Sequence, residues 1–204
     1  LDPISPEEIL SLSIDGAMKH LAPVFEAVSN IRSSLPNETT FLGFCGAPWT
    51  VATYMVAGRG TPDQAPTRIF THRHRSAFIH LIDLLTEVSI EYLCAQIEAG
   101  ADAVQVFDSW SGILGKNDFR DFSLDPMKRI VRGVKSKHPN TPIIGFPKGS
   151  SLHYELYVQD TGVDCVGLDW TFPMDLARSK LADHVVLQGN LDPTRLVSGG
   201  DALF

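Results

Sequence analysis

Five short apolar segments, each followed at once by glycine or polar residues, constrain the fold of this 204-residue chain more than any other feature. Their cores are continuous rather than alternating, which is typical of parallel strands covered on both faces. The first segment starts at Gly43 and leads through a Gly-Ala-Pro turn into a helix that carries Tyr54. The sequence therefore predicts five strands, over residues 43–45, 103–107, 142–146, 164–168 and 185–188.

Helical patterns fill the gaps between these strands. The strongest runs from Arg68 to Gly100, where apolar residues recur three to four positions apart and Gly100 is placed to cap the end. Another helix is predicted to begin at Asp125-Pro126 and to stop at His138-Pro139. We expect further, shorter helices over residues 17–33, 48–57, 151–161, 173–181 and from Pro193 onward.

Alternating strands and helices place the chain in the α/β class. An open doubly wound sheet is disfavoured, because a helix-rich segment precedes the first strand and no Gly-x-Gly-x-x-Gly motif opens a helix. The other all-parallel solution is the (β/α)8 TIM barrel, which has eight strands and typically ~250 residues. We therefore expect one domain over residues 1–204, an incomplete barrel of about five βα units. The start at Leu1 without methionine, and an end in a helix just begun, favour a fragment.

The overall charge and hydropathy exclude several classes of protein. A formal net charge of −7 argues against a nucleic-acid-binding surface, and the basic cluster at residues 68–75 is interpreted as a solvated helix start. No stretch approaches the ~20 apolar residues of a membrane-spanning helix, and no signal segment opens the chain. We expect a cytoplasmic protein.

The cysteines and histidines do not form the pattern of a metal site. Cys45, Cys94 and Cys165 are odd in number and widely separated, so we interpret them as small apolar residues rather than disulfide partners or metal ligands. His72 and His74 lack the i, i+4 spacing that places two imidazoles on one helical face. No metal is expected.

Beyond these patterns, the chain resembles the uroporphyrinogen decarboxylase family in a series of motifs that occur in the family's order and at its spacing. The resemblance is clearest from Phe41 to the end and only general over residues 1–40. The motifs are Gly43-Phe44-Cys45-Gly46-Ala47-Pro48-Trp49-Thr50 with Thr53-Tyr54-Met55, Phe107-Asp108-Ser109-Trp110, Ile144-Gly145-Phe146-Pro147-Lys148-Gly149, Gly167-Leu168-Asp169-Trp170 and Leu187-Gln188-Gly189-Asn190-Leu191-Asp192-Pro193.

The resemblance implies a homodimeric, cofactor-free enzyme of tetrapyrrole biosynthesis on a (β/α)8 barrel. Members of this family remove carbon dioxide from the four acetate side chains of uroporphyrinogen III and produce coproporphyrinogen III. Each decarboxylation needs an electron sink, which protonation of the adjacent pyrrole carbon provides. A site for this reaction must hold a polyanionic macrocycle, supply a proton and stabilise a cationic ring.

Three residues receive roles from the matched motifs. Tyr54 corresponds to the tyrosine beside the reacting acetate, and is the expected catalytic residue. Ser109 corresponds to the serine that binds a substrate carboxylate, and Phe107 is expected to line the pocket beside it. Without the resemblance, the pattern around Tyr54 favours a tyrosine packed within a helix. The pattern around Ser109 is equally consistent with a turn residue and a ligand contact.

Other residues at strand ends are weaker candidates. Asp108, Asp169 and Asp192 each follow a strand and could be catalytic carboxylates, although helix capping is favoured for Asp169 and Asp192. Lys148 has the position of a Schiff-base lysine in a barrel aldolase, an interpretation that we disfavour. Packing or rim positions are expected for the three tryptophans that follow strands, Trp49, Trp110 and Trp170.

Parts of the family pattern are absent from this sequence. The family's N-terminal Arg-Gln-Ala-Gly-Arg loop, the aspartate after it that binds the pyrrole N–H groups, and a C-terminal Asn-Leu-Gly-His-Gly motif have no counterpart, so we expect the chain to be inactive alone. A cobalamin-dependent methyltransferase of a related barrel family is one alternative, but its His-x-Cys zinc ligands are missing at Phe146-Pro147-Lys148. The other is a non-catalytic interaction protein derived from a barrel.

Overall fold

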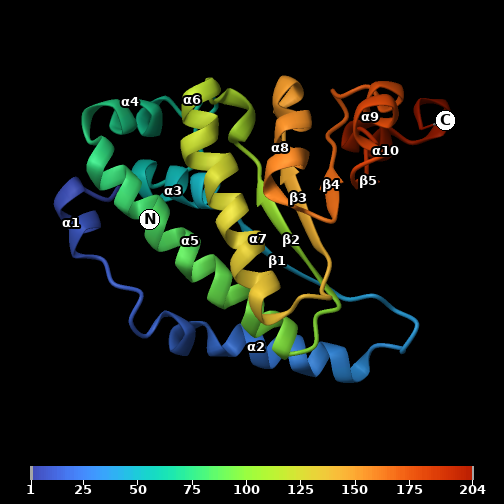
Figure 1. The fold of residues 1–204 in the computed structure, drawn as a ribbon, viewed down its shortest axis with the longest axis horizontal. Coiled ribbons are helices and arrows are strands. Elements are labelled where there is room, and N and C mark those ends of the chain that lie inside the picture. The colour runs from blue at the N-terminus through green and yellow to red at the C-terminus, as the bar shows by residue number, and fades with distance from the viewer. Residues whose placement is uncertain (1, 204) are drawn as a thin grey trace.

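The computed structural model describes residues 2–203, and its centre is one sheet of five parallel strands (Figure 1). The strands lie side by side in their order along the chain, so the sheet never reverses direction as a doubly wound sheet does. This order is that of an arc of a (β/α)8 barrel, as predicted. The strands are β1 (Leu42–Gly46), β2 (Ala103–Asp108), β3 (Ile143–Pro147), β4 (Cys165–Gly167) and β5 (Val186–Gln188).

A hydrogen bond across the inner face shows how strongly the sheet curls. The Gln105 side chain in β2 donates to Gln188 Oε1 in β5 at 2.9 Å, although these strands are three places apart in the sheet. In a flat sheet, strands three places apart would be separated by about 14 Å. The sheet therefore bends into a concave surface, and side chains from distant strands meet on it.

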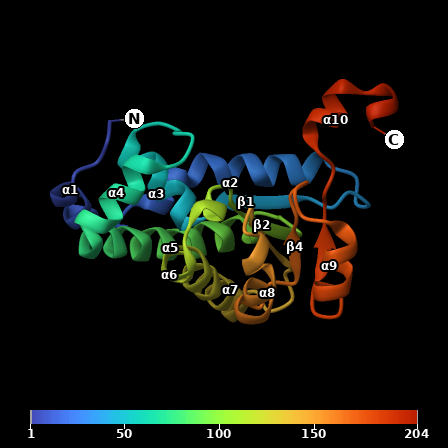
Figure 2. The ribbon, with the colours of Figure 1, turned by 90° about the horizontal axis from the view of Figure 1, so that it is seen from above.

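Helices α5, α7 and α8 lie side by side along the outer side of this arc (Figures 1 and 2), whereas α2 and α10 lie on the opposite side of the strands in Figure 2. Short 3₁₀ turns cover Ser111–Ile113, Ser151–His153 and Gly200–Ala202, and a π-helical segment covers Arg120–Leu124. The α-helices are α1 (Pro6–Ser11), α2 (Ala17–Ser34), α3 (Pro48–Ala57), α4 (Ala65–Arg73), α5 (Arg75–Glu98), α6 (Lys116–Phe119), α7 (Asp125–Lys137), α8 (Tyr154–Thr161), α9 (Met174–Leu181) and α10 (Pro193–Ser198).

Two helix predictions need correction. The single helix expected from Arg68 to Gly100 is wrong, because the chain leaves helical geometry at His74, with φ −131° and ψ 46°, and so forms α4 and α5. Asp125 is not an N-cap, since the helix has already begun at Lys116 and continues through the π-helical segment into α7. The end of α7 before His138 is as predicted.

An aromatic cluster forms the centre of the core between α3, α5 and the π-helical segment. The Trp49 ring is fully buried, lies edge-to-face with Phe78 at a centroid distance of 5.8 Å, and stacks on Phe122 at 5.9 Å. Its Nε1–H donates to the Trp110 carbonyl at 3.0 Å, so the buried polar atom is satisfied. The cluster attaches the helix after β1 to the loop after β2.

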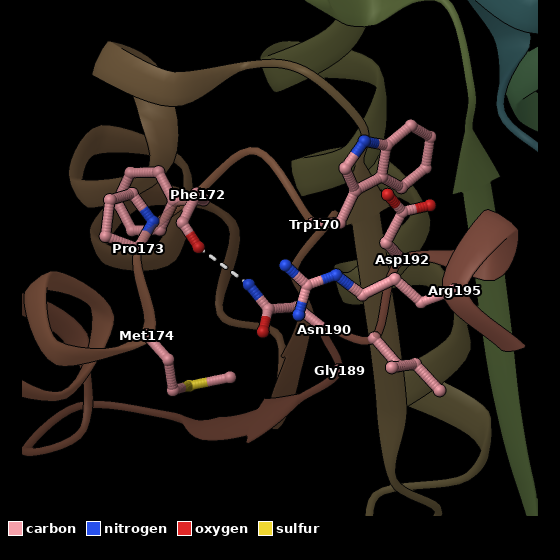
Figure 3. Close-up of a pocket in the computed structure, with 9 residues that line it drawn as sticks. Trp170, Phe172, Pro173, Met174, Gly189, Asn190, Asp192 and Arg195 are labelled. Carbon is pink, nitrogen blue, oxygen red and sulfur yellow. Dashed lines mark hydrogen bonds between the residues drawn. The ribbon is translucent and has the colours of Figure 1, made fainter. Parts of the chain in front are cut away.

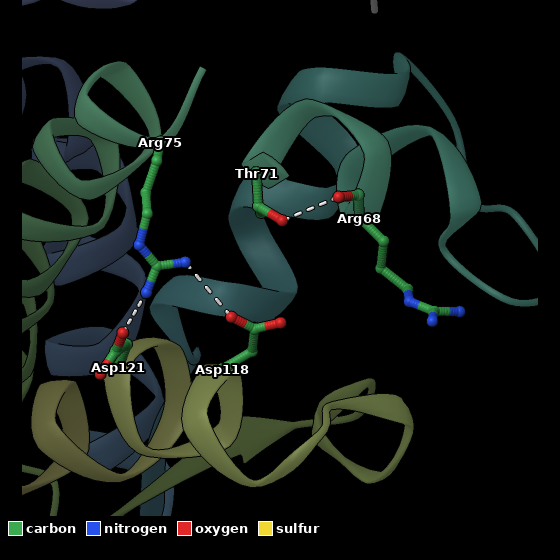
Figure 4. A network of polar contacts seen from close by, with 5 residues as sticks. All are labelled: Arg68, Thr71, Arg75, Asp118 and Asp121. Carbon is green, nitrogen blue, oxygen red and sulfur yellow. Dashed lines mark hydrogen bonds and ion pairs between the residues drawn. The ribbon is translucent and has the colours of Figure 1, made fainter. Parts of the chain in front are cut away.

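In the basic cluster at residues 68–75, Arg75 belongs to an ion-pair network and Arg68 does not (Figure 4). Arg75, at the start of α5, binds Asp118 at 3.3 Å and also Asp121, and its guanidinium lies over the Phe122 ring. The Arg68 side chain points away from these carboxylates. Because the pairs are exposed, their contribution to stability is small, about 1 kcal/mol or less for each.

The cysteines are free thiols. Cys45 and Cys94 are buried, in agreement with their interpretation as apolar residues, and Cys165 is half-buried. Burial raises the pKa of the Cys45 thiol to about 12, although a hydrogen bond with Ser89 acts to lower it. Over residues 2–203, no helix has the length and apolar character needed to cross a membrane.

The core position of Trp49 predicts a large effect of its removal. We expect Trp49→Ala to lower the free energy of unfolding by about 3–5 kcal/mol, because the change leaves a cavity and an unpaired Trp110 carbonyl. Trp170→Ala, the same substitution on a partly exposed ring, is the control and should cost less than about 1 kcal/mol. Urea unfolding measures both, and equal losses would contradict this account of the core.

Candidate active site

The loops at the carboxyl ends of the strands form the candidate site, at the edge of the sheet where barrel enzymes place their chemistry. Strand alternation decides which side chains face it. In β2, Phe107 faces the concave inner side and Asp108 faces the helices, and Ser109 is the first residue of the turn that follows the strand. Phe107 and Ser109 thus lie at the same end of β2, at the mouth.

A row of three phenylalanines covers the inner face near this edge. Phe107 in β2 lies edge-to-face with Phe44 in β1, at 5.9 Å, and with Phe146 in β3, at 5.8 Å. Phe44 is 60% exposed, and the other two rings are half-buried. The row is an apolar surface on the concave side, suited to contact with a flat apolar ligand.

Ser109 lines a small pocket of about 250 Å³ between the loops that follow β2 and β3. Lys148, the first residue after β3, lines the same pocket. Phe107 does not belong to its lining, so the expected pocket beside Ser109 is formed by other residues of the described chain. These are Trp110, Gly112, Ile113, Lys148 and Gly149.

Tyr54 lies in the second turn of α3, which begins at Pro48 immediately after the turn that follows β1. Its ring is 38% exposed and lies beside Gly60 in the connection to α4. It is therefore not the packed helix tyrosine that its pattern alone suggests. Within residues 2–203, Tyr54 is not part of the lining of the Ser109 pocket.

A larger cavity of about 600 Å³ lies between the loops after β4 and β5 (Figure 3). Trp170 forms one side of it, and the Arg195 side chain extends from α10 into the region near Asn190. The Asn190 amide donates to the carbonyls of Asp169, at 3.1 Å, and Phe172, at 2.6 Å. These bonds join the two loops that line the cavity.

Asp108 is a buried carboxylate on the helix side of the sheet. Only 2% of its surface is exposed, and it accepts hydrogen bonds from Thr50 Oγ1 at 2.8 Å and from Ser123 Oγ at 2.6 Å. Burial raises the pKa of the Asp108 carboxyl to about 6, although both hydrogen bonds oppose the rise. Its contacts attach β2 to α3 and to the π-helical segment.

Asp169 connects two loops rather than capping a helix, so the favoured capping interpretation is wrong for this residue. Its Oδ2 accepts from the Gly149 N–H at 2.7 Å and from the Tyr154 hydroxyl at 3.2 Å, and Oδ1 accepts from Thr171. The N-cap of α9 is Pro173. Burial alone would raise the pKa of the Asp169 carboxyl, but these hydrogen bonds together lower it.

Capping is confirmed for Asp192, which is the N-cap of α10. Its Oδ1 accepts from the Thr194 N–H at 2.8 Å and from the Thr194 hydroxyl at 2.7 Å. These hydrogen bonds lower the pKa of the Asp192 carboxyl.

Sequence reasoning missed two of the three phenylalanines. Phe44, in the middle of β1, and Phe146, near the end of β3, lie at inward positions and flank Phe107. Their signal was present, because an aromatic residue occurs in each of the first three strands. Only the register of the strands shows that the three side chains share a face.

Sequential parallel strands, outer helices and polar loops at the carboxyl edge define a β/α-barrel protein with a candidate site at the barrel mouth. Comparison with known families agrees with this class. The family model described as "Uroporphyrinogen decarboxylase (URO-D)" matches residues 2–203. The chain belongs to the uroporphyrinogen decarboxylase family.

Curated relatives with this description are similar along the whole chain. Uroporphyrinogen decarboxylases of Sinorhizobium fredii, Mesorhizobium japonicum and Brucella anthropi are 53%, 55% and 53% identical to it over 203 residues. In each case the match covers 100% of this chain and 59% of the relative. The chain thus spans about three fifths of the length of these relatives.

A solved structure supports the fold independently. A methyltransferase from Methanosarcina mazei superposes with a TM-score of 0.78, over 94% of this chain and 55% of the methyltransferase, at 18% sequence identity. A likeness at this identity shows a shared fold and no shared activity. Among residues 2–203, no group of three or more His, Cys, Asp or Glu side chains is arranged to hold a metal ion.

The buried carboxyl of Asp108 predicts a pH-dependent stability. Its pKa in the folded protein, about 6, lies above the unfolded value of about 4, so the folded state binds the proton more tightly. The contribution of Asp108 to stability is therefore present below about pH 4 and is lost as the pH rises to about 6. A shift of about two units corresponds to roughly 3 kcal/mol.

Urea unfolding from pH 4 to 7 tests this prediction against Asp108→Asn, which cannot titrate. We expect the free energy of unfolding of the parent, relative to this variant, to fall by roughly 3 kcal/mol across that range. Asp160→Asn makes the same chemical change on an exposed side chain and serves as the control. A constant difference between the parent and Asp108→Asn would refute a raised pKa at this site.

Proposed function

We propose that this protein acts in the decarboxylation of uroporphyrinogen III to coproporphyrinogen III. The observation that carries the proposal is the family match over residues 2–203, together with identities of 53–55% to curated uroporphyrinogen decarboxylases. The proposal takes the four acetate side chains of the macrocycle as the groups that lose carbon dioxide.

The concave face has features that suit this substrate. The row Phe44, Phe107 and Phe146 offers apolar rings to the macrocycle, and donors at the mouth offer hydrogen bonds to its carboxylates. Ser109, in the loop that follows β2, is assigned to one substrate carboxylate. An apolar floor with a polar rim orients a ligand that is itself apolar at its centre and charged at its edge.

Tyr54 is assigned to the reacting acetate. Its phenol is exposed in α3, which follows β1 at the mouth, so it is accessible to a bound ligand. A phenolic hydroxyl can donate a hydrogen bond to the acetate carboxylate and orient it before carbon dioxide leaves, while the electron pair of the broken carbon–carbon bond passes to the protonated ring. Protonation of the pyrrole carbon remains the step that makes the ring an electron sink, and it requires a proton donor.

The proposal includes three properties that rest on the family resemblance alone. They are a homodimeric assembly, a cytoplasmic location and catalysis without a cofactor. Light scattering of the purified protein measures the first, and activity after exhaustive dialysis against a chelator measures the third.

An anaerobic decarboxylation assay tests the proposed function. We expect no turnover of uroporphyrinogen III by the 204-residue chain, and turnover by a form extended at both ends to the length of its curated relatives. In that form, Tyr54→Phe should lower kcat/KM by about a hundredfold and Ser109→Ala by about tenfold, because each removes a donor to a charged group.

Tyr92→Phe, on α5 and away from the mouth, is the matched control and should retain parental activity. A folded extended form without turnover would overturn the proposal and favour a non-catalytic interaction protein. Turnover by the parent that Tyr54→Phe leaves unchanged would instead remove Tyr54 from the mechanism.

A further inference from the structure

The backbone of Lys148 is held beside Ser109 by the neighbouring loop. The Lys148 N–H donates to the Asp108 carbonyl at 3.1 Å, and the Lys148 carbonyl accepts from the Gly112 N–H at 3.1 Å and from the Ser111 hydroxyl at 3.4 Å. Both backbone polar groups of Lys148 are therefore used by the loop that carries Ser109. Ser109 and Lys148 line one pocket because the loops that carry them are joined by these backbone hydrogen bonds.

The next residue makes the pocket rigid. The Gly149 N–H donates to Asp169 Oδ2 at 2.7 Å, and a φ of +74° at this position favours glycine. A Cβ added at Gly112 would lie only 2.6 Å from the Gly149 carbonyl carbon and oxygen. The two loops thus approach as closely as their backbones permit, and the pocket needs no rearrangement to be formed.

The charge of Lys148 is positioned but not neutralised. Its Nζ lies 5.0 Å from the centroid of the Trp170 ring, a cation–π contact that orients the ammonium group. Among residues 2–203, no Asp or Glu forms an ion pair with Lys148; the ion pairs of the other lysines join Lys135 to Asp164 and Lys180 to Glu155. The nearby Asp169 is occupied by hydrogen bonds from Gly149, Tyr154 and Thr171.

We propose that Lys148 and Ser109 together bind one peripheral carboxylate of the substrate in the pocket between the loops after β2 and β3. An ammonium group and a hydroxyl are both donors to a carboxylate, and the charged donor makes the stronger bond. The volume of about 250 Å³ admits a carboxylate arm rather than a macrocycle. The inference rests on the proposed function for the identity of the anion.

Binding of uroporphyrin III to the 204-residue chain, followed by porphyrin fluorescence anisotropy, tests the role of Lys148. We expect Lys148→Gln to weaken binding by about tenfold and Lys148→Arg to retain most of the affinity, because only the first removes the charge. Lys137→Gln removes the same charge from an exposed lysine at the end of α7, distant from the mouth, and should change the affinity less than twofold.

A double-mutant cycle tests whether Lys148 and Ser109 hold the same carboxylate. If they do, the combined Lys148→Gln and Ser109→Ala variant should lose less affinity than the product of the two single losses. If the affinity losses of the two single variants multiply in the double variant, Lys148 and Ser109 act on different groups of the porphyrin, and the shared subsite is overturned. Unchanged binding in Lys148→Gln, or no saturable binding by the parent chain, would also overturn it. Circular dichroism verifies that each variant is folded.

Failure of the subsite can be distinguished from failure of the proposed function. If the extended form does not decarboxylate uroporphyrinogen III but porphyrin binding to the chain still depends on Lys148, the function is wrong and the carboxylate subsite is supported. If the extended form is active and porphyrin binding is insensitive to Lys148, the subsite alone is wrong.

Discussion

The curl of the sheet is the constraint on which the rest of the structure depends, and the hydrogen bond between Gln105 and Gln188 spans it. These side chains meet across the concave face past β3 and β4, and β4 carries Gly167 at an inward position beside Gln188. A Cβ there would lie 2.6 Å from the Phe146 ring and 3.3 Å from Gln188 Oε1. The curl turns the inward side chains of separate strands toward each other, and it turns the loops at the strand ends toward one mouth.

The two sides of the sheet have different roles. On the outer side, the buried Asp108 and the aromatic cluster around Trp49 attach the strands to the helices. At the mouth, Asp169 and the close approach of Gly112 to Gly149 hold neighbouring loops in place. This division lets a rigid scaffold present exposed groups such as Lys148, whose charge is available for a ligand because the scaffold does not use it.

Local sequence was sufficient for the strands and for most of the helices. All five strands lie where short apolar cores predicted them, because burial on both faces leaves an unmistakable apolar run. Prediction from local sequence failed at Asp125-Pro126, which has the pattern of a helix start although the helix begins earlier in the chain. Pro126 has no N–H to donate, which is why it resembles a first-turn proline. The helix nevertheless continues through this point, because the preceding π-helical segment is helical and the Asp125 N–H donates to the Arg120 carbonyl. The break at His74 lies in a polar run, residues 71–76, which precedes the apolar repeat that begins at Phe78, so the repeat did not mark it.

By itself, the sequence determined the class of fold and the family, since both depend on short motifs and their order. It could not distinguish Asp108, Asp169 and Asp192, three aspartates that each follow a strand. Only the tertiary structure shows that Asp108 is a buried carboxyl on the helix side, that Asp169 accepts hydrogen bonds from two loops, and that Asp192 caps a helix. The physical reason is that the partners of the first two come from other strands and helices, so their environments exist only once the sheet has curled and the loops have met.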